Sequence, residues 1–233
     1  MRPATLFTTV LAAAALAGCA SLTTHSGPPI PAPEFRAGDQ WVYRVKTGFG
    51  NPLIYDETWT VTSASAQGTD LRVVAKGGWL DTERRELWPA PGLVSQGALF
   101  EVETRRFATP LERYRYPLTV GERWNQRVVN YNEDLRRDGP ISRYVRVIGY
   151  ETVTVPAGTF EALRLEVLMQ LDDGERWRWP TDCLYTVWYA PAVKGVVKEN
   201  RRATYVERRS DETNGLLPAQ NATVELLRFS AGG

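Results

Sequence analysis

Segments in which apolar and polar residues alternate one by one recur along the chain from residue 38 onward. Trp41, Tyr43 and Val45 alternate with Arg44 and Lys46. The same pattern returns in residues 71–76, 163–170, 185–189 and 224–226. Because neighbouring side chains of a strand point to opposite faces, this alternation predicts strands with one buried face and one solvated face.

Short turn sequences separate these segments, among them Gly68-Thr69-Asp70, residues 156–159 and residues 172–174. Such sequences favour hairpins, so we expect an antiparallel β protein. Two stretches, 98–107 and 131–137, have a weak helical period, and for the second a polar loop is the preferred interpretation.

Two short motifs occur twice, in the same order. The first, glycine–acidic residue–x–tryptophan, and the second, Trp-x-Ala-Pro, begin at residues 38 and 121 and at residues 88 and 188. Motifs that recur in order predict an internal repeat. We therefore expect an all-β domain over 35–230, a curved antiparallel sheet in the form of a half-barrel or open barrel. Two pseudo-repeated meanders, about 35–110 and 117–209, would build it.

The N-terminus is typical of an export signal. Arg2 precedes an apolar stretch over residues 6–17, and the segment ends in Leu16-Ala17-Gly18-Cys19. This ending resembles the lipobox of bacterial lipoproteins, which implies cleavage after residue 18 and a diacylglycerol on Cys19. A plain secretory signal with a chance cysteine is the alternative. By the sorting rule of that family, Ala20 implies the outer membrane, on its periplasmic face.

Residues 19–34 would form the lipidated cysteine and a tether rich in Ser, Thr, Gly and Pro. Such a segment tends to be extended and is expected to bury no apolar surface, so we expect it to hold the domain off the bilayer. The only histidine, His25, lies in it, and we expect no imidazole in a folded site. With Cys19 lipidated, Cys183 has no disulfide partner and is interpreted as a small residue in a strand.

Charge and composition limit the chemistry. Without Arg2 the chain keeps 28 − 1 = 27 basic side chains against 27 acidic ones, whereas nucleic-acid-binding proteins have a basic excess. One histidine and two cysteines do not supply the usual zinc ligands or a Ser-His-Asp triad, and no glycine-rich phosphate loop occurs. We therefore predict no metal, no cofactor and no catalytic residue.

Acidic clusters leave one enzymatic alternative, a carboxylate-dependent hydrolase. The clusters are Asp81, Glu83 and Glu86, and Asp172, Asp173 and Glu175. Solvated strand faces and turn formation are the preferred interpretation of both.

Eight tryptophans and ten tyrosines are many for one domain, and aromatic rings line binding pockets well. Five tryptophans are interpreted as core: Trp41, Trp59, Trp88, Trp124 and Trp188. The candidate ligand-binding residues are Arg176, Trp177, Arg178, Trp179, Tyr185 and Tyr189. Trp177 and Trp179 alternate with two arginines, which predicts a strand with an aromatic face. For these two tryptophans a place in the core is the equal alternative to a ligand surface.

The second half of the chain resembles a family of uncharacterised bacterial exported proteins with VPAGTF and WYAPGVG signatures. The matching segments are 153–162, 188–199 and the Pro-Leu-x-Val-Gly-x-x-Trp run over 117–124, so the resemblance covers about 117–199. Ala192 and Lys194 stand where the family usually has glycine. The resemblance implies a β-rich domain, often lipid-anchored or periplasmic, and no activity.

These observations predict a non-enzymatic lipoprotein whose aromatic sheet face binds an envelope lipid, glycan or polypeptide. An accessory protein that docks a larger envelope complex through its sheet edges is the alternative from another class. The membrane, through the lipid anchor, is an expected partner, and nucleic acid is not.

Overall fold

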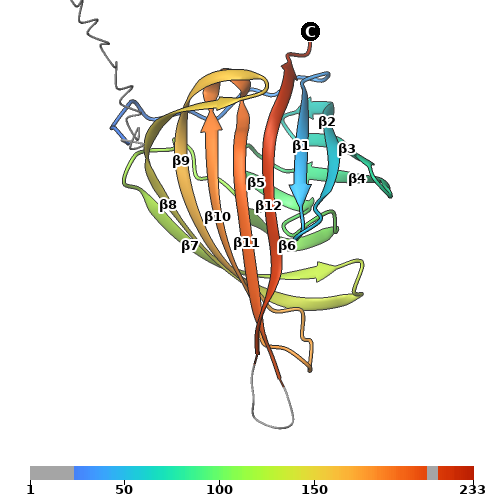
Figure 1. Cartoon of the computed structure of the whole chain (residues 1–233). Coiled ribbons are helices and arrows are strands. Elements are labelled where there is room, and N and C mark those ends of the chain that lie inside the picture. Colours follow the sequence, from blue (N-terminus) through green and yellow to red (C-terminus); the bar gives the residue numbers. More distant parts are fainter. Residues whose placement is uncertain (1–23, 209–214) are drawn as a thin grey trace, which may run out of the picture.

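The computed structural model describes residues 24–208 and 215–233. The signal peptide and the predicted lipidation site Cys19 lie outside the described residues. Twelve strands follow one another along the chain, labelled in Figure 1: β1 Gln40–Thr47, β2 Leu53–Ser65, β3 Gly68–Gly77, β4 Leu80–Trp88, β5 Leu93–Gly97, β6 Arg105–Glu112, β7 Arg123–Asn132, β8 Arg137–Val155, β9 Gly158–Leu171, β10 Thr181–Ala190, β11 Gly195–Glu207 and β12 Gly215–Ser230. The described residues also include one 3₁₀ helix, η1 Pro191–Val193, and no helix long and apolar enough to cross a membrane.

The sheet closes on itself. Each strand pairs with its neighbours in sequence, and β1 also pairs with β12, so that Trp41 lies opposite Phe229 and Val45 opposite Val224. The prediction of an all-β antiparallel fold is confirmed, but the half-barrel or open barrel is wrong. Strand twist accumulates over twelve strands, and pairing the first edge with the last satisfies backbone groups that an open sheet would leave exposed.

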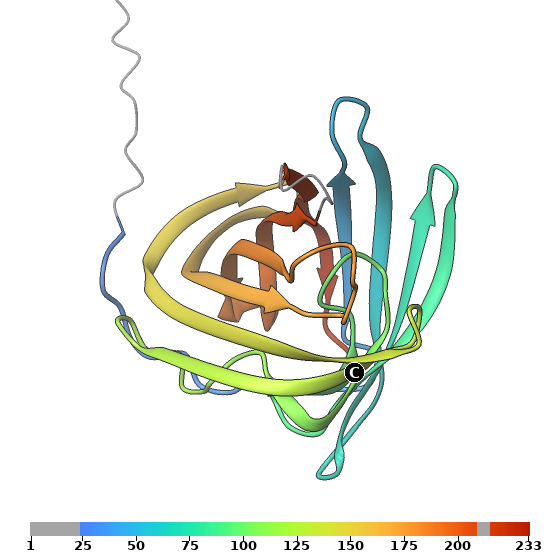
Figure 2. The same cartoon turned by 90° about the horizontal axis from the view of Figure 1, so that it is seen from below.

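Two seams of the barrel are narrow. Strands β4 and β5 pair only at Leu87 and Gln96, and β6 pairs with β7 only over residues 105–107. Seen along the barrel, the β1–β2 and β3–β4 hairpins project beyond the ring of the other strands (Figure 2). The sheet is thus continuous, but at these two seams the neighbouring strands share only a few paired residues.

Neither weak helical candidate is a helix. Residues 98–104 form turns and loop before β6 begins at Arg105. Residues 131–137 contain the end of β7, a turn, and the first residue of β8. Strand pairing on both sides decides the conformation in each case, because a short helical period without tertiary contacts stabilises little.

The two glycine–acidic residue–x–tryptophan motifs have the same turn geometry. Gly38 and Gly121 have φ values of +90° and +87°, which glycine adopts without strain. The Gly38 amide donates to the Val61 carbonyl at 2.8 Å, and the Gly121 amide donates to the Val147 carbonyl at 3.0 Å. Both turns therefore fix the start of a strand in the same way. Whether the whole meanders are related stays a prediction.

The described part of the predicted tether, from Thr24 onward, lies against the barrel. His25 pairs with Tyr150, and Ile30 exchanges two backbone hydrogen bonds with Leu118, at 2.9 and 2.8 Å. Ile30 is only 4% exposed, so the expectation that this segment buries no apolar surface is wrong. Composition alone missed the backbone pairing and the one large apolar side chain that fix the segment.

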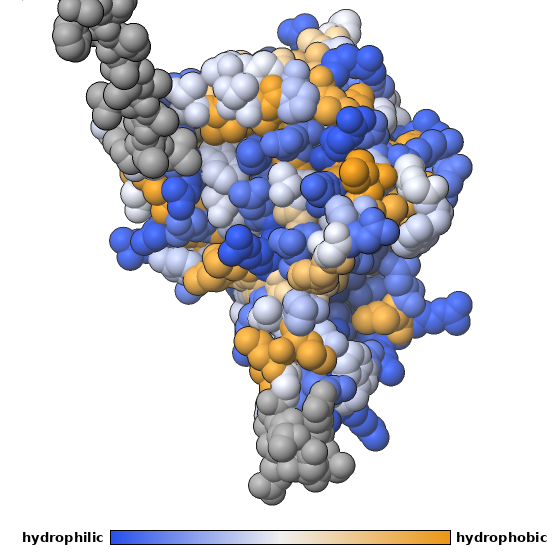
Figure 3. All heavy atoms as spheres, viewed as in Figure 1, coloured by the Kyte–Doolittle hydropathy of each residue, from blue (hydrophilic) through white to orange (hydrophobic). Residues whose placement is uncertain are grey.

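The interior is built from two clusters of buried apolar side chains. One includes Leu111, Val145 and Leu165, and the other includes Val45, Leu71 and Leu226. Trp41, Trp124 and Trp188 are buried as predicted, and Trp59 and Trp88 are partly buried. The outer face in Figure 3 is mostly hydrophilic, with separate apolar spots.

Candidate functional site

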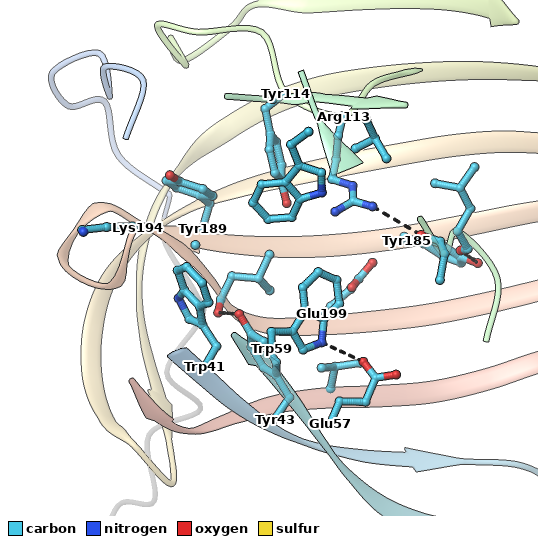
Figure 4. A pocket seen from close by; sticks show the side chains of 18 of the residues that line it. Trp41, Tyr43, Glu57, Trp59, Arg113, Tyr114, Tyr185, Tyr189, Lys194 and Glu199 are labelled. Carbon is cyan, nitrogen blue, oxygen red and sulfur yellow. Dashed lines mark hydrogen bonds between the residues drawn. The ribbon is translucent and has the colours of Figure 1, made fainter. Parts of the chain in front are cut away.

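A cavity of about 140 Å³ lies inside the barrel where the two core clusters meet. Trp88 packs against both clusters and forms part of its wall. Side chains from strands on opposite sides of the barrel converge on this space (Figure 4). The lining includes Trp41, Tyr43, Glu57, Trp59, Arg84, Leu99, Arg113, Tyr114, Tyr116, Met169, Tyr185, Tyr189, Lys194, Glu199, Arg201 and Val224. The walls are thus aromatic, with several charged groups among them.

Three tyrosines form one wall. The ring of Tyr114 lies 5.4 Å from that of Tyr189 and 6.1 Å from that of Tyr116, centroid to centroid. The Tyr116 hydroxyl lies 3.1 Å from the Tyr189 hydroxyl. Burial raises the pKa of Tyr189 to about 12 and also raises that of Tyr114, so both hydroxyls stay protonated at neutral pH. This wall can pack against an apolar ring and can still donate hydrogen bonds.

Two tryptophans of the opposite wall are each fixed by a glutamate two residues earlier in the chain. The Trp59 indole donates to Glu57 at 3.0 Å, and the Trp88 indole donates to Glu86 at 3.1 Å. Because residues two apart share one face of a strand, the Glu-x-Trp spacing places both side chains on the inner face. Arg84 lies between them, 3.0 Å from Glu57 and 5.4 Å from the centre of the Trp59 ring. The rings are therefore held in position by hydrogen bonds and an ion pair.

Two other cations at the cavity, Arg201 and Lys194, are also paired. Arg201 donates to Glu199 at 2.7 Å, and Lys194 donates to Asp39 at 2.8 Å at the η1–β11 turn. Burial opposes the charge on Arg201, but Glu199 outweighs it and raises the pKa of the guanidinium. Buried ions are tolerated when a partner of opposite charge replaces water, which these pairs provide.

The positive charges of Arg113 and Arg143 are less well balanced by nearby carboxylates than those of Arg84 and Arg201. Arg113 reaches Glu86 only at 3.4 Å, and Glu86 already binds Arg84 and the Trp88 indole. Arg143, 8% exposed, donates to the backbone carbonyl of Glu112 at 2.8 Å. Burial lowers the pKa of Arg143 to about 10, and the nearby Arg113 acts in the same direction. Tyr114 and, more weakly, Glu199 and Glu112 act to raise it. The guanidinium still carries its charge at neutral pH.

The structure separates the six residues predicted to bind a ligand. Tyr185 and Tyr189 are buried and line the cavity. Arg176, Trp177, Arg178 and Trp179 lie in the β9–β10 connection, where Trp177 and Trp179 are 49% and 51% exposed. The predicted strand through these four is a loop, joined to β11 by hydrogen bonds such as Trp179 amide to Val206 carbonyl at 2.9 Å. Pro180 and the turn before it explain why the alternation there did not produce a strand.

The exposed aromatic residues of this loop pack against the end of β11. Trp177 meets Tyr205 edge to face at 5.4 Å, and Arg178 lies over both rings at 5.5 Å. Arg208 lies over Trp179 at 4.0 Å. These contacts stabilise the loop on the outside of the barrel, away from the cavity.

The acidic clusters are engaged in ion pairs. Glu83 binds Arg72 at 2.6 Å on the outer surface, and Glu86 points inward. Asp173 is buried against Arg105 at 2.7 Å, whereas Glu175 binds Arg137 at 2.9 Å. The pair proposed for hydrolysis, Asp173 and Glu175, therefore contacts two different arginines, and each carboxylate already has a cation.

Cys183 is buried on the inner face of β10, in agreement with its interpretation as a small strand residue. Burial raises the pKa of its thiol to about 12. Among the described residues, no three histidine, cysteine, aspartate or glutamate side chains are grouped so that they could hold a metal ion.

Sequence analysis missed most of the charged residues at the cavity because charged positions were taken as solvated. A signal was present in the period-two pattern. Glu57 falls between Tyr55 and Trp59 on one face, and Arg143 falls between Ile141 and Val145. A charged residue on the apolar face of a strand indicates a buried ion or a site.

Comparison with known proteins supports the fold. No family model and no curated protein matches the sequence. One similar structure is that of a protein from Bacteroides fragilis, which is assigned as exported and described as having a YmcC-like fold. It superposes on this chain with a TM-score of 0.51 at 13% identity. An assigned lipoprotein from Parabacteroides distasonis superposes with a TM-score of 0.52 at 13% identity. Each match covers 87% of this chain and 100% of the other. The chain has the fold of these proteins.

Proposed function

We propose that this protein is a lipoprotein of the outer membrane, on its periplasmic face, that binds a small and largely apolar envelope molecule inside its barrel. The observation that carries the proposal is the aromatic cavity, whose rings are fixed by hydrogen bonds before any ligand is present. Such a concave, mostly apolar space with a few polar groups is the usual form of a small-molecule site.

The volume of the cavity limits the size of the ligand that can bind inside the barrel. A cavity of about 140 Å³ is close to the roughly 150 Å³ of an engineered apolar cavity that binds benzene. A polypeptide segment or a glycan chain is too large for that volume. Among the ligands that we considered from the sequence, this favours a lipid-like molecule, of which one ring or one short apolar segment enters the barrel.

Anchoring rests on the lipobox and is supported by the lipoprotein assignment of a protein with the same fold. A lipid anchor on Cys19 would also limit the distance between the barrel and the bilayer. Thr24, the first described residue, is the fifth residue after Cys19. At a maximum of about 3.5 Å per residue, Thr24 lies within about 17 Å of the lipidated cysteine. The protein would therefore lie close to the bilayer surface, which is a source of lipid-like ligands.

Two experiments test this function. Metabolic labelling with palmitate should mark the wild-type protein and not Cys19→Ala. For the cavity, benzamide serves as a neutral single-ring probe in a ligand-observed NMR titration. Val224→Phe fills the cavity from β12, and Thr223→Phe is the matched control, because residue 223 faces the other side of the same strand. We expect Val224→Phe to abolish benzamide binding and the control to retain it. Equal binding by both variants would refute an interior site.

A docking function remains the second candidate, and one observation favours it. Trp79, at the tip of the β3–β4 hairpin, is 82% exposed. The neighbouring β4 pairs with β5 at only one position, which leaves part of its edge open. However, Asp81, Glu83 and Arg85 lie along that edge, and charged side chains discourage strand addition. A photo-crosslinking residue in place of Trp79 should capture one stoichiometric partner in cells if docking is the function.

A further inference from the structure

Arg143 occupies an unusual position on the inner face of β8. Its neighbours on that face, Ile141 and Val145, are fully buried in the core. Arg143 is only 8% exposed, and its guanidinium has one protein acceptor among the described residues, the Glu112 carbonyl at 2.8 Å. That carbonyl also accepts from the Trp124 indole at 3.3 Å, so it does not depend on Arg143 for a partner.

The other interior arginines of the described chain have carboxylate partners. Arg84 binds Glu57 at 3.0 Å, Arg105 binds Asp173 at 2.7 Å, and Arg201 binds Glu199 at 2.7 Å. Arg143 has no carboxylate within 4 Å among the described residues. A buried ion without a counter-ion is strongly destabilising, so its retention needs a reason other than stability.

Arg143 does not itself line the cavity, but its guanidinium binds the backbone of Glu112, which directly precedes the lining residues Arg113 and Tyr114. Arg113 and Tyr114, which both line the cavity, lie close enough to Arg143 to influence its pKa. Arg113 shares its only carboxylate, Glu86, with Arg84. Arg113 therefore has only a shared carboxylate, and Arg143 has none within ion-pair distance among the described residues.

The remaining charged groups at the cavity interact with cations other than Arg143. Lys194 and Asp39 neutralise each other at the lip. Glu101 also lines the cavity, from the β5–β6 loop, and its electrostatic neighbour is Arg201, not Arg143. Arg113 and Arg143 are therefore two neighbouring cations without a carboxylate of their own.

We infer that Arg143, together with Arg113 and the Tyr114 hydroxyl, binds the carboxylate of a small carboxylic acid whose apolar body, about one ring in size, occupies the aromatic cavity. The inference rests on the proposed interior site and names the class of its ligand. Guanidinium groups suit this role because their paired donors match the two oxygens of a carboxylate. Ligand binding would supply the missing counter-ion, so affinity should depend on the charge of the ligand.

Benzoate and benzamide test the charge directly, because they have nearly the same shape and differ in charge. We expect the wild-type protein to bind benzoate at least about tenfold more tightly than benzamide, as measured by isothermal titration calorimetry. In Arg143→Met this ratio should fall to below about threefold, and in Arg143→Lys, which keeps the charge and loses the paired donors, it should be intermediate. Arg146→Met is the matched control, since Arg146 is exposed on the same strand and pairs with Glu166; its ratio should equal that of the wild type.

Thermal unfolding of the ligand-free proteins separates a binding role from a structural one. If the role of Arg143 is to bind an anion, then Arg143→Met removes an unpaired buried charge from the ligand-free protein and should raise its melting temperature. A lower melting temperature together with an unchanged benzoate-to-benzamide ratio would overturn the inference. Equal affinity of the wild type for both rings would overturn it while leaving the interior site intact. Failure of both rings to bind the wild type would overturn the proposed interior site as well.

Discussion

Asp39 joins three parts of the chain at the lip of the cavity, so replacing it should cost far more than replacing an exposed carboxylate. Its buried side chain accepts hydrogen bonds from the Arg36 amide at 2.9 Å, the Gly232 amide at 2.8 Å and the Lys194 ammonium at 2.8 Å. Burial alone would raise the pKa of Asp39, but these donors outweigh burial and lower it. The substitution Asp39→Asn keeps the size of the side chain and removes its charge.

The expected magnitude follows from the three donors. An asparagine has one carbonyl oxygen, and its amide group must face at least one of the donors. A buried donor without an acceptor costs about 1–3 kcal/mol, and weaker bonds to the neutral oxygen add to this. Lys194 is 24% exposed and can turn toward water, which keeps the cost below the roughly 3–5 kcal/mol of a fully buried broken pair. We expect a loss of about 2–3 kcal/mol, or about 4–12 °C in melting temperature.

Urea denaturation at neutral pH measures this loss, with Asp56→Asn as the matched control. Asp56 is 40% exposed and binds Arg44 at 2.9 Å, so its replacement should cost less than about 1 kcal/mol. Because the folded pKa of Asp39 is lower than the unfolded value near 3.9, the carboxylate stabilises the fold above that value. This stabilisation is lost as the pH falls through the folded pKa. The gap between wild type and Asp39→Asn should therefore shrink on acidification. A gap smaller than that of the control, or one that widens in acid, would refute the reasoning.

Three further predictions follow from the anchor, the thiol and the core. A fluorophore at Glu161→Cys, beside His25, should transfer energy efficiently to a dye in the bilayer, and one at Leu216→Cys, at the far end of the β11–β12 hairpin, should not (Figure 1); equal transfer would refute the short tether. The Cys183 thiol, whose pKa burial raises to about 12, should react with a disulfide reagent at pH 8 only after unfolding; rapid labelling of the folded protein would contradict its burial. Trp188→Phe removes the indole bond to Glu151 at 2.8 Å and should lower the free energy of unfolding by about 1–3 kcal/mol in urea, whereas no change would mean that Arg164 alone satisfies that carboxylate.

Strand positions were predictable from sequence because each strand has one dry and one wet face. The pattern that marked Trp41, Tyr43 and Val45 corresponds to β1, and the Gly38 and Gly121 turns lie where the repeated motif placed them. Closure was not predictable in the same way. Alternation tells which face of a strand is buried, but it does not tell which strand pairs with which across the chain. The register that joins β1 to β12 therefore leaves no local signal.

The candidate site was half predictable. Tyr185 and Tyr189 were identified because aromatic residues at alternating positions are visible in the sequence, and both line the cavity. Trp177 and Trp179 have the same local pattern but lie outside the barrel, because a neighbouring turn and Pro180 end the alternation. Local pattern thus finds aromatic faces, and only the topology decides whether such a face points into the barrel or onto its surface.

Strand number explains why this barrel has a cavity at all. An interior of about eight strands is just wide enough for side chains to fill, and wider barrels leave space. Twelve strands exceed that number, and even the largest side chains, such as Trp59 and Trp88, leave a volume of about 140 Å³ between the two core clusters. The Glu-x-Trp spacing then fixes the rings around that volume, since each indole has its acceptor on the same strand. The space inside the barrel therefore follows from the number of strands, and the hydrogen bonds of the two indoles determine its shape.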